Sequence, residues 1–209
     1  MAIAMIRKIL LIVVMNLISI AGGIFITINL SYLYFPFFVN KQMVLLTGVN
    51  KFHILEAYRQ MVSYLEFPWI SKLKVNDFSF SIHGLIHMAE VKQLFLLDFS
   101  LIIIGIILLI IVLQKDVAEP YLYSVKNMTK FSMIFIPVLG TLALSNFNQS
   151  FIMMHQLLFK NNYWMFDPAI DPIINILPDY FFGVCFVSIL VCYEIIMWQI
   201  YRKIKRRVV

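Results

Sequence analysis

Four long apolar runs alternate with polar segments along the chain. They cover residues 9–30, 94–113, 131–146 and 180–201. A helix needs about 20 apolar residues to cross a bilayer, so the first, second and fourth runs are long enough. The third run is shorter and contains Pro137 and Gly140, but a crossing there, with some extension, completes a four-span layout. The pattern predicts an all-α membrane protein with four transmembrane helices.

The first run has a second interpretation. Ser19, Ile20 and Ala21 match the small-x-small pattern of a signal-peptide cleavage site, and a basic segment precedes them. The apolar run nevertheless continues past this point to Leu30. We therefore expect an uncleaved membrane anchor rather than a leader that is removed.

The composition also indicates a membrane protein. Of the 209 residues, 62% are hydrophobic and 13% are charged, and the mean hydropathy is +0.88. A soluble domain of this size could not bury so much apolar surface. The net charge of +6 could point to a nucleic-acid partner, but ten of the 17 basic residues flank apolar runs. These ten are Arg7, Lys8, Lys115, Lys126, Lys130, Arg202, Lys203, Lys205, Arg206 and Arg207. Their placement favours membrane topology over nucleic-acid binding.

The basic residues predict the orientation of the chain. The C-terminal tail carries five of them and the loop before the third run carries three, whereas the loop after it carries only Lys160. Because basic loops stay in the cytoplasm, we expect both termini inside the cell. The first loop also holds several lysines, but long loops follow this rule poorly. The chain is then one integral domain of the cell membrane, 1–209, with an extracellular cap at 34–92 and a second outer segment at 147–179.

The first outer segment has the pattern of a small folded cap. Apolar side chains recur at helical spacing after residue 50, at Leu55, Tyr58, Met61, Val62 and Leu65. This stripe predicts an amphipathic helix that ends near Pro68. In the following stretch, NDFSFSIH, three apolar residues (Phe78, Phe80 and Ile82) alternate with three polar ones (Ser79, Ser81 and His83). That alternation predicts a short, half-buried β-strand that bends at Gly84 into the second span.

One histidine lies where the second span begins. His87 falls in its first turns, with Glu90 three residues on and Asp98 eleven residues on along the same helical face. An acidic residue inside a span is a functional-site candidate, because burying it unpaired is costly. We expect Asp98 to support the His87 face of the helix.

A second histidine lies in the second outer segment. A polar cap at Asn148 or Ser150 would start a short helix there, and Phe151, His155 and Phe159 would share one face of it. Trp164 follows among aromatic residues of the kind that settle at a membrane interface. An interfacial amphipathic helix with one polar residue explains this segment equally well. The functional interpretation is favoured by the predicted depth in the membrane, because two unrelated segments each bring a histidine to the same outer boundary.

Two histidines in one site are suited to proton transfer. An imidazole titrates near pH ~6.5, so one ring can accept a proton while the other donates one. A serine or cysteine nucleophile is not indicated, because the sequence has no GxSxG motif and both Cys185 and Cys192 lie inside an apolar run. The nucleophile is then expected to come from the substrate or from water.

A metal site and a non-catalytic scaffold are the alternatives. His83 and His87 have the i, i+4 spacing of the HExxH metalloproteases, and His155 could be a third ligand. Gly84, however, stands where that motif has its glutamate, and a bend there would separate the two side chains. A small membrane scaffold whose cap binds partners needs no catalytic site at all. We expect no metal and no cofactor.

Two stretches of the chain resemble a known family. They are YLEFPW followed by LKVNDFSFSIHGLIHMAEVKQLF, and FIMMHQLLFKNNYWMFDPAIDPIINILPDYFF. Together they resemble the lipoprotein intramolecular transacylase family, Lit, of Gram-positive bacteria. With the four-span layout, the similarity extends over nearly the whole chain. One departure is Glu90, where the family pattern leads us to expect aspartate.

The resemblance implies a fold and a reaction. The fold is four membrane helices under an extracellular cap, and the partners are membrane lipid and a diacylglyceryl lipoprotein. The enzyme is expected to move the sn-2 acyl chain to the α-amino group of the N-terminal cysteine, which gives a lyso-form lipoprotein. The resemblance makes His87 and His155 the catalytic residues. The supporting or substrate-binding candidates are Glu90, Lys92, Asp98, Phe151, Trp164, Asp167 and Trp69. Among possible oxyanion donors, Lys92 is the leading one, although it could equally be an interface anchor.

Overall fold

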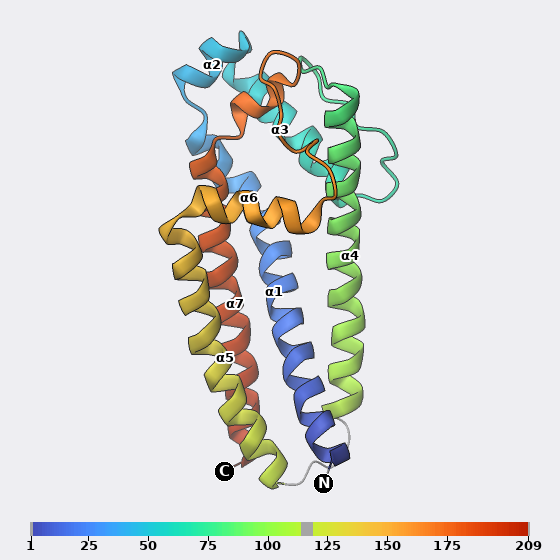
Figure 1. The fold of residues 1–209 in the computed structure, drawn as a ribbon, viewed down its shortest axis with the longest axis vertical. Helices are drawn as coiled ribbons and strands as arrows, with labels where there is room; N and C mark the ends of the chain where they lie inside the picture. Colours follow the sequence, from blue (N-terminus) through green and yellow to red (C-terminus); the bar gives the residue numbers. More distant parts are fainter. Residues whose placement is uncertain (1, 114–118, 209) are drawn as a thin grey trace. The chain divides into compact units, whose positions relative to one another are not determined.

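The computed structural model describes residues 2–113 and 119–208, and it is all-helical there. Lys115, one of the basic residues that predict the topology, lies outside the described residues. Four long helices and three shorter ones are joined by loops and one 3-10 turn (Figure 1). Their bounds are α1 Ala2–Phe38, α2 Lys41–Thr47, α3 Lys51–Glu66, α4 Ile82–Leu113, α5 Glu119–Ser145, α6 Phe147–Leu158, η1 Pro172–Ile176 and α7 Asp179–Val208.

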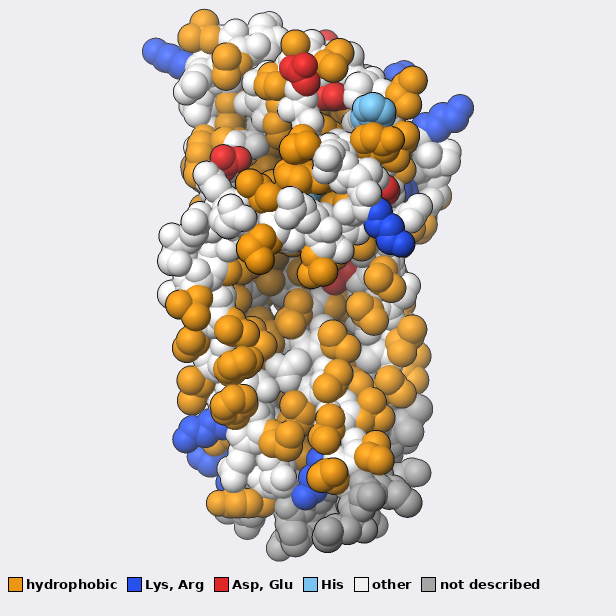
Figure 2. All heavy atoms as spheres, in the orientation of Figure 1, with side chains coloured by type: hydrophobic (Ala, Val, Ile, Leu, Met, Phe, Trp, Pro, Cys, Tyr) orange, Lys and Arg blue, Asp and Glu red, His pale blue; other side chains and the backbone are white. Residues whose placement is uncertain are grey.

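The four long helices contain the four predicted spans. Each has a stretch long and apolar enough to cross a membrane, and these stretches are Lys8–Phe38, Ile82–Ile110, Tyr123–Ser145 and Asp179–Arg206. The helix α5 begins well before the apolar run that predicted it, and Pro137 lies inside the helix without ending it. Figure 2 shows hydrophobic side chains on the outer surface of α4 and α5, where large apolar residues are exposed. Such a surface fits lipid rather than water.

The chain divides into two compact units. Unit 1 comprises residues 1–27, 98–145 and 186–209, and unit 2 comprises residues 28–97 and 146–185. Helices α1, α4 and α7 each contribute residues to both units.

Unit 1 is held together by apolar packing and by one polar network. The Tyr193 hydroxyl on α7 donates to Asn16 Oδ1 on α1 at 2.7 Å, and Asn16 Nδ2 donates to Ser132 Oγ on α5 at 3.1 Å. These hydrogen bonds satisfy polar groups that lipid cannot satisfy. Gly140 adds a close approach, because a Cβ there would lie 2.5 Å from a Leu190 methyl group.

The core of unit 2 is built around α3, which confirms the amphipathic helix predicted after residue 50. Its buried face consists of Ile54, Ala57, Tyr58, Met61, Val62, Tyr64 and Leu65. The Asn50 side chain caps its first turn by accepting from the His53 N–H at 3.1 Å. Nearby, α2 packs on η1, and the left-handed Gly48 (φ 68°) ends α2.

The predicted β-strand is wrong, and no strand occurs in the described parts of the chain. Phe78 is buried as expected, but Ile82 is 77% exposed and is already the first residue of α4. Ser81 starts this helix, because its Oγ accepts from the Gly84 N–H at 2.9 Å and its carbonyl accepts from the Leu85 N–H. Gly84 is therefore helical, and the predicted bend at that residue is also wrong.

Candidate active site

His87 and His155 lie side by side in unit 2, one on α4 and the other on α6. Their ring centroids are 6.0 Å apart, and the planes are tilted by 38°. Both residues are nearly enclosed, with exposed fractions of 7% and 8%. The residues are 68 positions apart in the sequence, so only the tertiary fold brings them together.

Four aromatic side chains surround the pair. The Phe159 ring contacts both imidazoles, at 4.7 Å from His87 and 5.6 Å from His155. Phe166 stands edge-on to His87, while Phe151 and Trp164 lie 4.1 and 4.9 Å from the His155 ring. The site therefore excludes water with apolar walls, which suits a lipid substrate.

The local structure of α6 fixes the tautomer of His155. Asn146 begins the helix by accepting from the Gln149 N–H. One turn separates Phe151 from His155, and the His155 Nδ1 lies 2.9 Å from the Phe151 carbonyl oxygen. A carbonyl can only accept, so Nδ1 carries the hydrogen and Nε2 keeps a lone pair in the neutral ring. Burial lowers the pKa of the His155 imidazole, and the hydrogen bond to Phe151 opposes this shift.

A carboxylate faces His87 from one turn further along α4. Glu90 Oε2 lies 4.0 Å from His87 Nδ1, which is ion-pair distance but too long for a hydrogen bond. The other carboxylate oxygen, Oε1, accepts from Asn161 Nδ2 at 2.7 Å. Asn161 in turn accepts from the Tyr163 N–H. The segment after α6 thus holds the carboxylate in place beside His87. The sequence indicated only that Glu90 follows His87 by three residues.

Unpaired polar atoms are concentrated at this site. Among the residues that the structure describes, five buried side-chain polar atoms have no hydrogen-bond partner. Three of them belong to the histidine surroundings: His87 Nδ1, Glu90 Oε2 and Trp164 Nε1. Buried polar groups are almost always paired in folded proteins, so such a cluster indicates a place for a polar ligand.

The contacts of Lys92 do not support the oxyanion role expected for it. Its ammonium group donates to three backbone carbonyls, those of Tyr64 at 2.7 Å, Phe67 at 2.8 Å and Ile70 at 2.6 Å. An ammonium group has three hydrogens, and all three are committed here. Lys92 instead binds backbone carbonyls at the C-terminal end of α3 and in the loop that follows.

Asp171 is a residue that the sequence analysis missed. Its carboxylate accepts from the Ser81 N–H at 2.6 Å and from the Ser81 hydroxyl at 2.7 Å, although it is 90 positions away. Gly84 leaves room for this carboxylate, because a Cβ there would lie 2.5 Å from Asp171 Oδ1. The contact ties the segment after α6 to the start of α4. The only signal in the sequence is the second Asp-Pro of DPAIDP, which by itself indicates a turn.

Trp69, Asp167 and His83 have contacts of their own. Asp98 belongs to unit 1. Trp69 is 75% exposed and stacks on Phe67. The Asp167 carboxylate accepts from the Ala169 N–H within its own turn, which is a structural contact. His83 shares α4 with His87, but its exposed ring stacks on Tyr163 at 4.1 Å.

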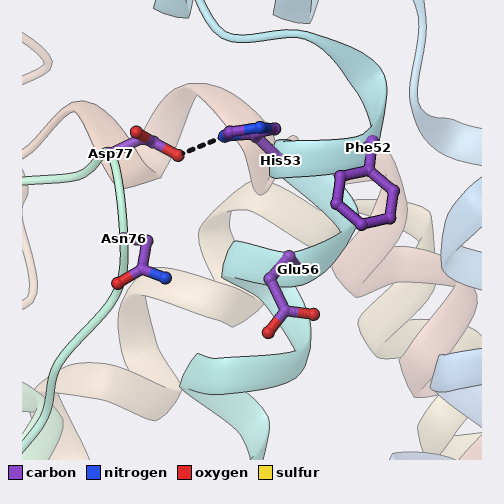
Figure 3. A pocket seen from close by; sticks show the side chains of 5 residues that line it. All are labelled: Phe52, His53, Glu56, Asn76 and Asp77. Carbon is purple, nitrogen blue, oxygen red and sulfur yellow. Dashed lines mark hydrogen bonds and ion pairs between the residues drawn. The ribbon is translucent and has the colours of Figure 1, made fainter.

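A separate open cavity of about 440 Å³ lies between α3 and the loop before α4 (Figure 3). Phe52, His53, Glu56, Asn76 and Asp77 line it. His53 Nδ1 and Asp77 Oδ2 are 2.6 Å apart across its upper edge, and both side chains are exposed. Neither catalytic candidate lines this cavity.

The metal-site alternative requires at least three ligand groups in one place. Within the described residues, no group of three or more His, Cys, Asp or Glu side chains is placed to hold a metal ion. The arrangement at His87 and His155 instead offers two imidazoles and one carboxylate for moving protons.

Comparison with known proteins identifies the family. The model of the family described as lipoprotein intramolecular transacylase Lit matches residues 9–182. The chain belongs to this family. It is therefore an acyltransferase, as the family description states. A search of curated proteins gave no match.

Solved structures of one member of the family have the same fold. The membrane-integral transacylase Lit from Bacillus cereus is 28% identical, with a TM-score of 0.74 over 96% of this chain and 97% of that one. Two variants of the same protein, with a single histidine replaced by arginine or by alanine, give TM-scores of 0.69 and 0.66 at 27% and 28% identity. The two alignments include 96% of this chain and 93% and 94% of the respective variant chains. These matches and the four apolar helices establish a multi-pass membrane protein.

Proposed function

We propose that this chain moves the sn-2 acyl group of a diacylglyceryl lipoprotein to the α-amino group of that lipoprotein's N-terminal cysteine. The observation that carries the proposal is the enclosed pair His87 and His155, supplied by two different helices within aromatic walls. Amine and ester belong to one molecule, so the enzyme needs no acyl-carrying side chain of its own. Its main tasks are to hold the two groups together and to move protons.

The reaction balances if both imidazoles begin neutral. An α-amino group has an ordinary pKa of about 8, so at neutral pH the substrate arrives mostly as an ammonium. Its first proton passes to His87, and the amine then attacks the ester carbonyl carbon. An N–C bond forms as the nitrogen gives its second proton to His155. The C–O bond to the glyceryl group then breaks, and His87 returns its proton to the departing oxygen. Amide and alcohol are formed, and one proton leaves His155 for water.

The contacts of each ring support this division of roles. His155 carries its hydrogen on Nδ1, which donates to Phe151, so the Nε2 lone pair is available as the base. The carboxylate of Glu90 lies 4.0 Å from His87 Nδ1 and stabilises the charged ring that acts as the acid. Asn161 fixes the carboxylate by holding its other oxygen. Each of the two proton transfers is typically worth ~10²-fold or more in rate.

The proposed orientation puts this site at the outer face of the cell membrane. Lys126 and Lys130 near the start of α5, and the basic tail of α7, are then cytoplasmic. Unit 2, which holds the histidines, faces outward. Diacylglyceryl lipoproteins carry their acyl chains in the membrane, so a site at the boundary receives the ester directly.

The product is an isomer of the substrate, and this fact determines the experiment. Transfer within one molecule leaves the mass unchanged, removes the free amine and gives an N-acyl fragment in tandem mass spectrometry. Hydrolysis by a protease or esterase would instead change the mass. The purified protein is incubated with a synthetic diacylglyceryl-cysteine peptide that has a free α-amino group, with and without a chelator. An isomeric N-acylated product that forms in both samples supports the proposal, and a hydrolysed or unchanged peptide contradicts it.

A mixing control tests whether the transfer is intramolecular. Two peptides of different sequence, one with isotope-labelled acyl chains, are incubated together with the enzyme. We expect the label to remain on its own peptide. Labelled acyl groups on the second peptide would show transfer between molecules.

A further inference from the structure

Acyl transfer needs a hydrogen-bond donor that the two histidines do not supply. When the amine attacks the ester, the carbonyl oxygen becomes a negatively charged oxyanion. Preorganised donors aimed at that oxygen are usually a large part of the rate enhancement. With His155 accepting one proton and His87 delivering another, neither ring is free to stabilise the oxyanion throughout the reaction.

The indole of Trp164 has an uncommitted donor beside the histidine pair. Its ring centroid lies 4.9 Å from that of His155, at a tilt of 35°. The Nε1 atom is buried and has no hydrogen-bond partner in the described part of the chain. An indole N–H can only donate, and buried tryptophans usually find an acceptor. The described part of the protein therefore offers no acceptor for this donor, and a bound ligand could supply one.

Lys92, Asn161 and His155 already donate hydrogen bonds to other groups of the protein. All three ammonium hydrogens of Lys92 lie on backbone carbonyls. Asn161 Nδ2 donates one hydrogen to the Glu90 carboxylate, and Nδ1–H of His155 donates to Phe151. The remaining unpaired atoms at the site are Glu90 Oε2, an acceptor when ionised, and His87 Nδ1, which faces that carboxylate.

We infer that Trp164 is a catalytic residue, whose indole N–H donates to the carbonyl oxygen of the ester under attack and to the oxyanion formed from it. The inference rests on the proposed acyl transfer and assigns a donor that this reaction requires. The segment after α6 then has two tasks, since Asn161 orients the acid–base apparatus and Trp164 stabilises the developing charge.

The test replaces the donor while keeping an aromatic ring. Trp164→Phe retains the packing on His155 but has no N–H, and Trp198→Phe is the matched control on an exposed tryptophan of α7. Initial rates are measured on the synthetic diacylglyceryl-cysteine peptide with full-length protein in detergent. We expect kcat of Trp164→Phe to fall about 10²-fold, with KM within about twofold of wild type, because the bond strengthens in the transition state. Trp198→Phe should match wild type.

Three outcomes would overturn the inference. One is an unchanged kcat for Trp164→Phe, and another is a raised KM with kcat retained, because the indole would then bind a carbonyl that does not react. If Trp164→Phe melts below wild type, an isosteric analogue with sulfur in place of the indole N–H is incorporated at position 164. Wild-type kcat in that well-packed protein is the third contradicting result. Wild-type activity in the same assay tests the proposed function separately.

Discussion

At the scale of single residues, the environment of each ring determines what it can do. His155 is held by the Phe151 carbonyl, whereas His87 faces the carboxylate of Glu90. Two identical side chains are thereby made different, which a base and an acid in one reaction require. The sequence predicted both histidines, but it could not assign their roles, because each role depends on a partner that only the fold provides.

The base role proposed for His155 predicts a pH dependence with a definite sign. Protonation removes the Nε2 lone pair, and burial lowers the pKa of this ring below its ordinary value of ~6.5. The neutral base therefore persists to more acidic pH than that of an exposed histidine. We expect kcat at saturating peptide to stay constant from neutral pH to pH ~6.5 and to fall at lower pH. An acidic limb of kcat centred above pH ~6.5 would argue against His155 as the base.

At the scale of elements, the start of α4 and the segment after α6 form one unit through Asp171. Its carboxylate holds Ser81, the residue that caps α4, and Gly84 provides the space for it. The contact brings the first turns of α4, which carry His87, to the segment that follows His155. The precision of the histidine pair therefore depends on a carboxylate that touches neither ring.

A glycine substitution tests this dependence. Alanine is favoured over glycine inside a helix by about 1 kcal/mol, so propensity alone predicts that Gly84→Ala stabilises α4. The added Cβ would instead lie 2.5 Å from Asp171 Oδ1 and displace it. We expect kcat/KM to fall at least tenfold and the melting temperature in detergent to drop. Gly183→Ala on α7 is the control, since a Cβ there meets nothing within 4 Å. Equal behaviour of the two variants would contradict the role of Asp171.

The elements show why parts of the fold were predictable and other parts were not. The four spans and α3 follow from periodicity and apolar length, which are local properties of the sequence. The false strand arose because Phe78, Phe80 and Ile82 alternate, yet no second segment pairs with them in the described chain. Ser81 took the role of a helix cap because Asp171 supports it from 90 positions away. The contacts of Lys92 were unpredictable for the same reason, since its three carbonyl partners lie 22 to 28 positions earlier.

At the scale of the whole molecule, the proposed orientation follows from charge asymmetry. The basic tail of α7 and the lysines near the start of α5 would place both chain ends in the cytoplasm under the positive-inside rule. In this orientation unit 2 would meet its lipoprotein substrate outside the cell.

Labelling of single cysteines tests this orientation. Cysteine is introduced at Asn76, Asn162 or Asn127, all exposed positions, after Cys185 and Cys192 have been replaced by alanine. A membrane-impermeant thiol reagent applied to intact cells should label positions 76 and 162 but not position 127. Lysed cells, in which all three positions should react, are the control. Labelling of position 127 in intact cells would reverse the proposed topology.

The central claim is that His87 and His155 together carry out the acyl transfer, and one measurement tests it most directly. His87→Gln and His155→Gln are purified and incubated with the synthetic diacylglyceryl-cysteine peptide, and tandem mass spectrometry quantifies the N-acylated isomer. We expect each variant to lose at least ~10²-fold in rate, since each removes a proton-transfer group. Both should still accumulate in the membrane, because neither position supplies the apolar length of a span. His53→Ala, outside the site, should keep wild-type activity. Wild-type yields of the isomer from both glutamine variants would contradict the account.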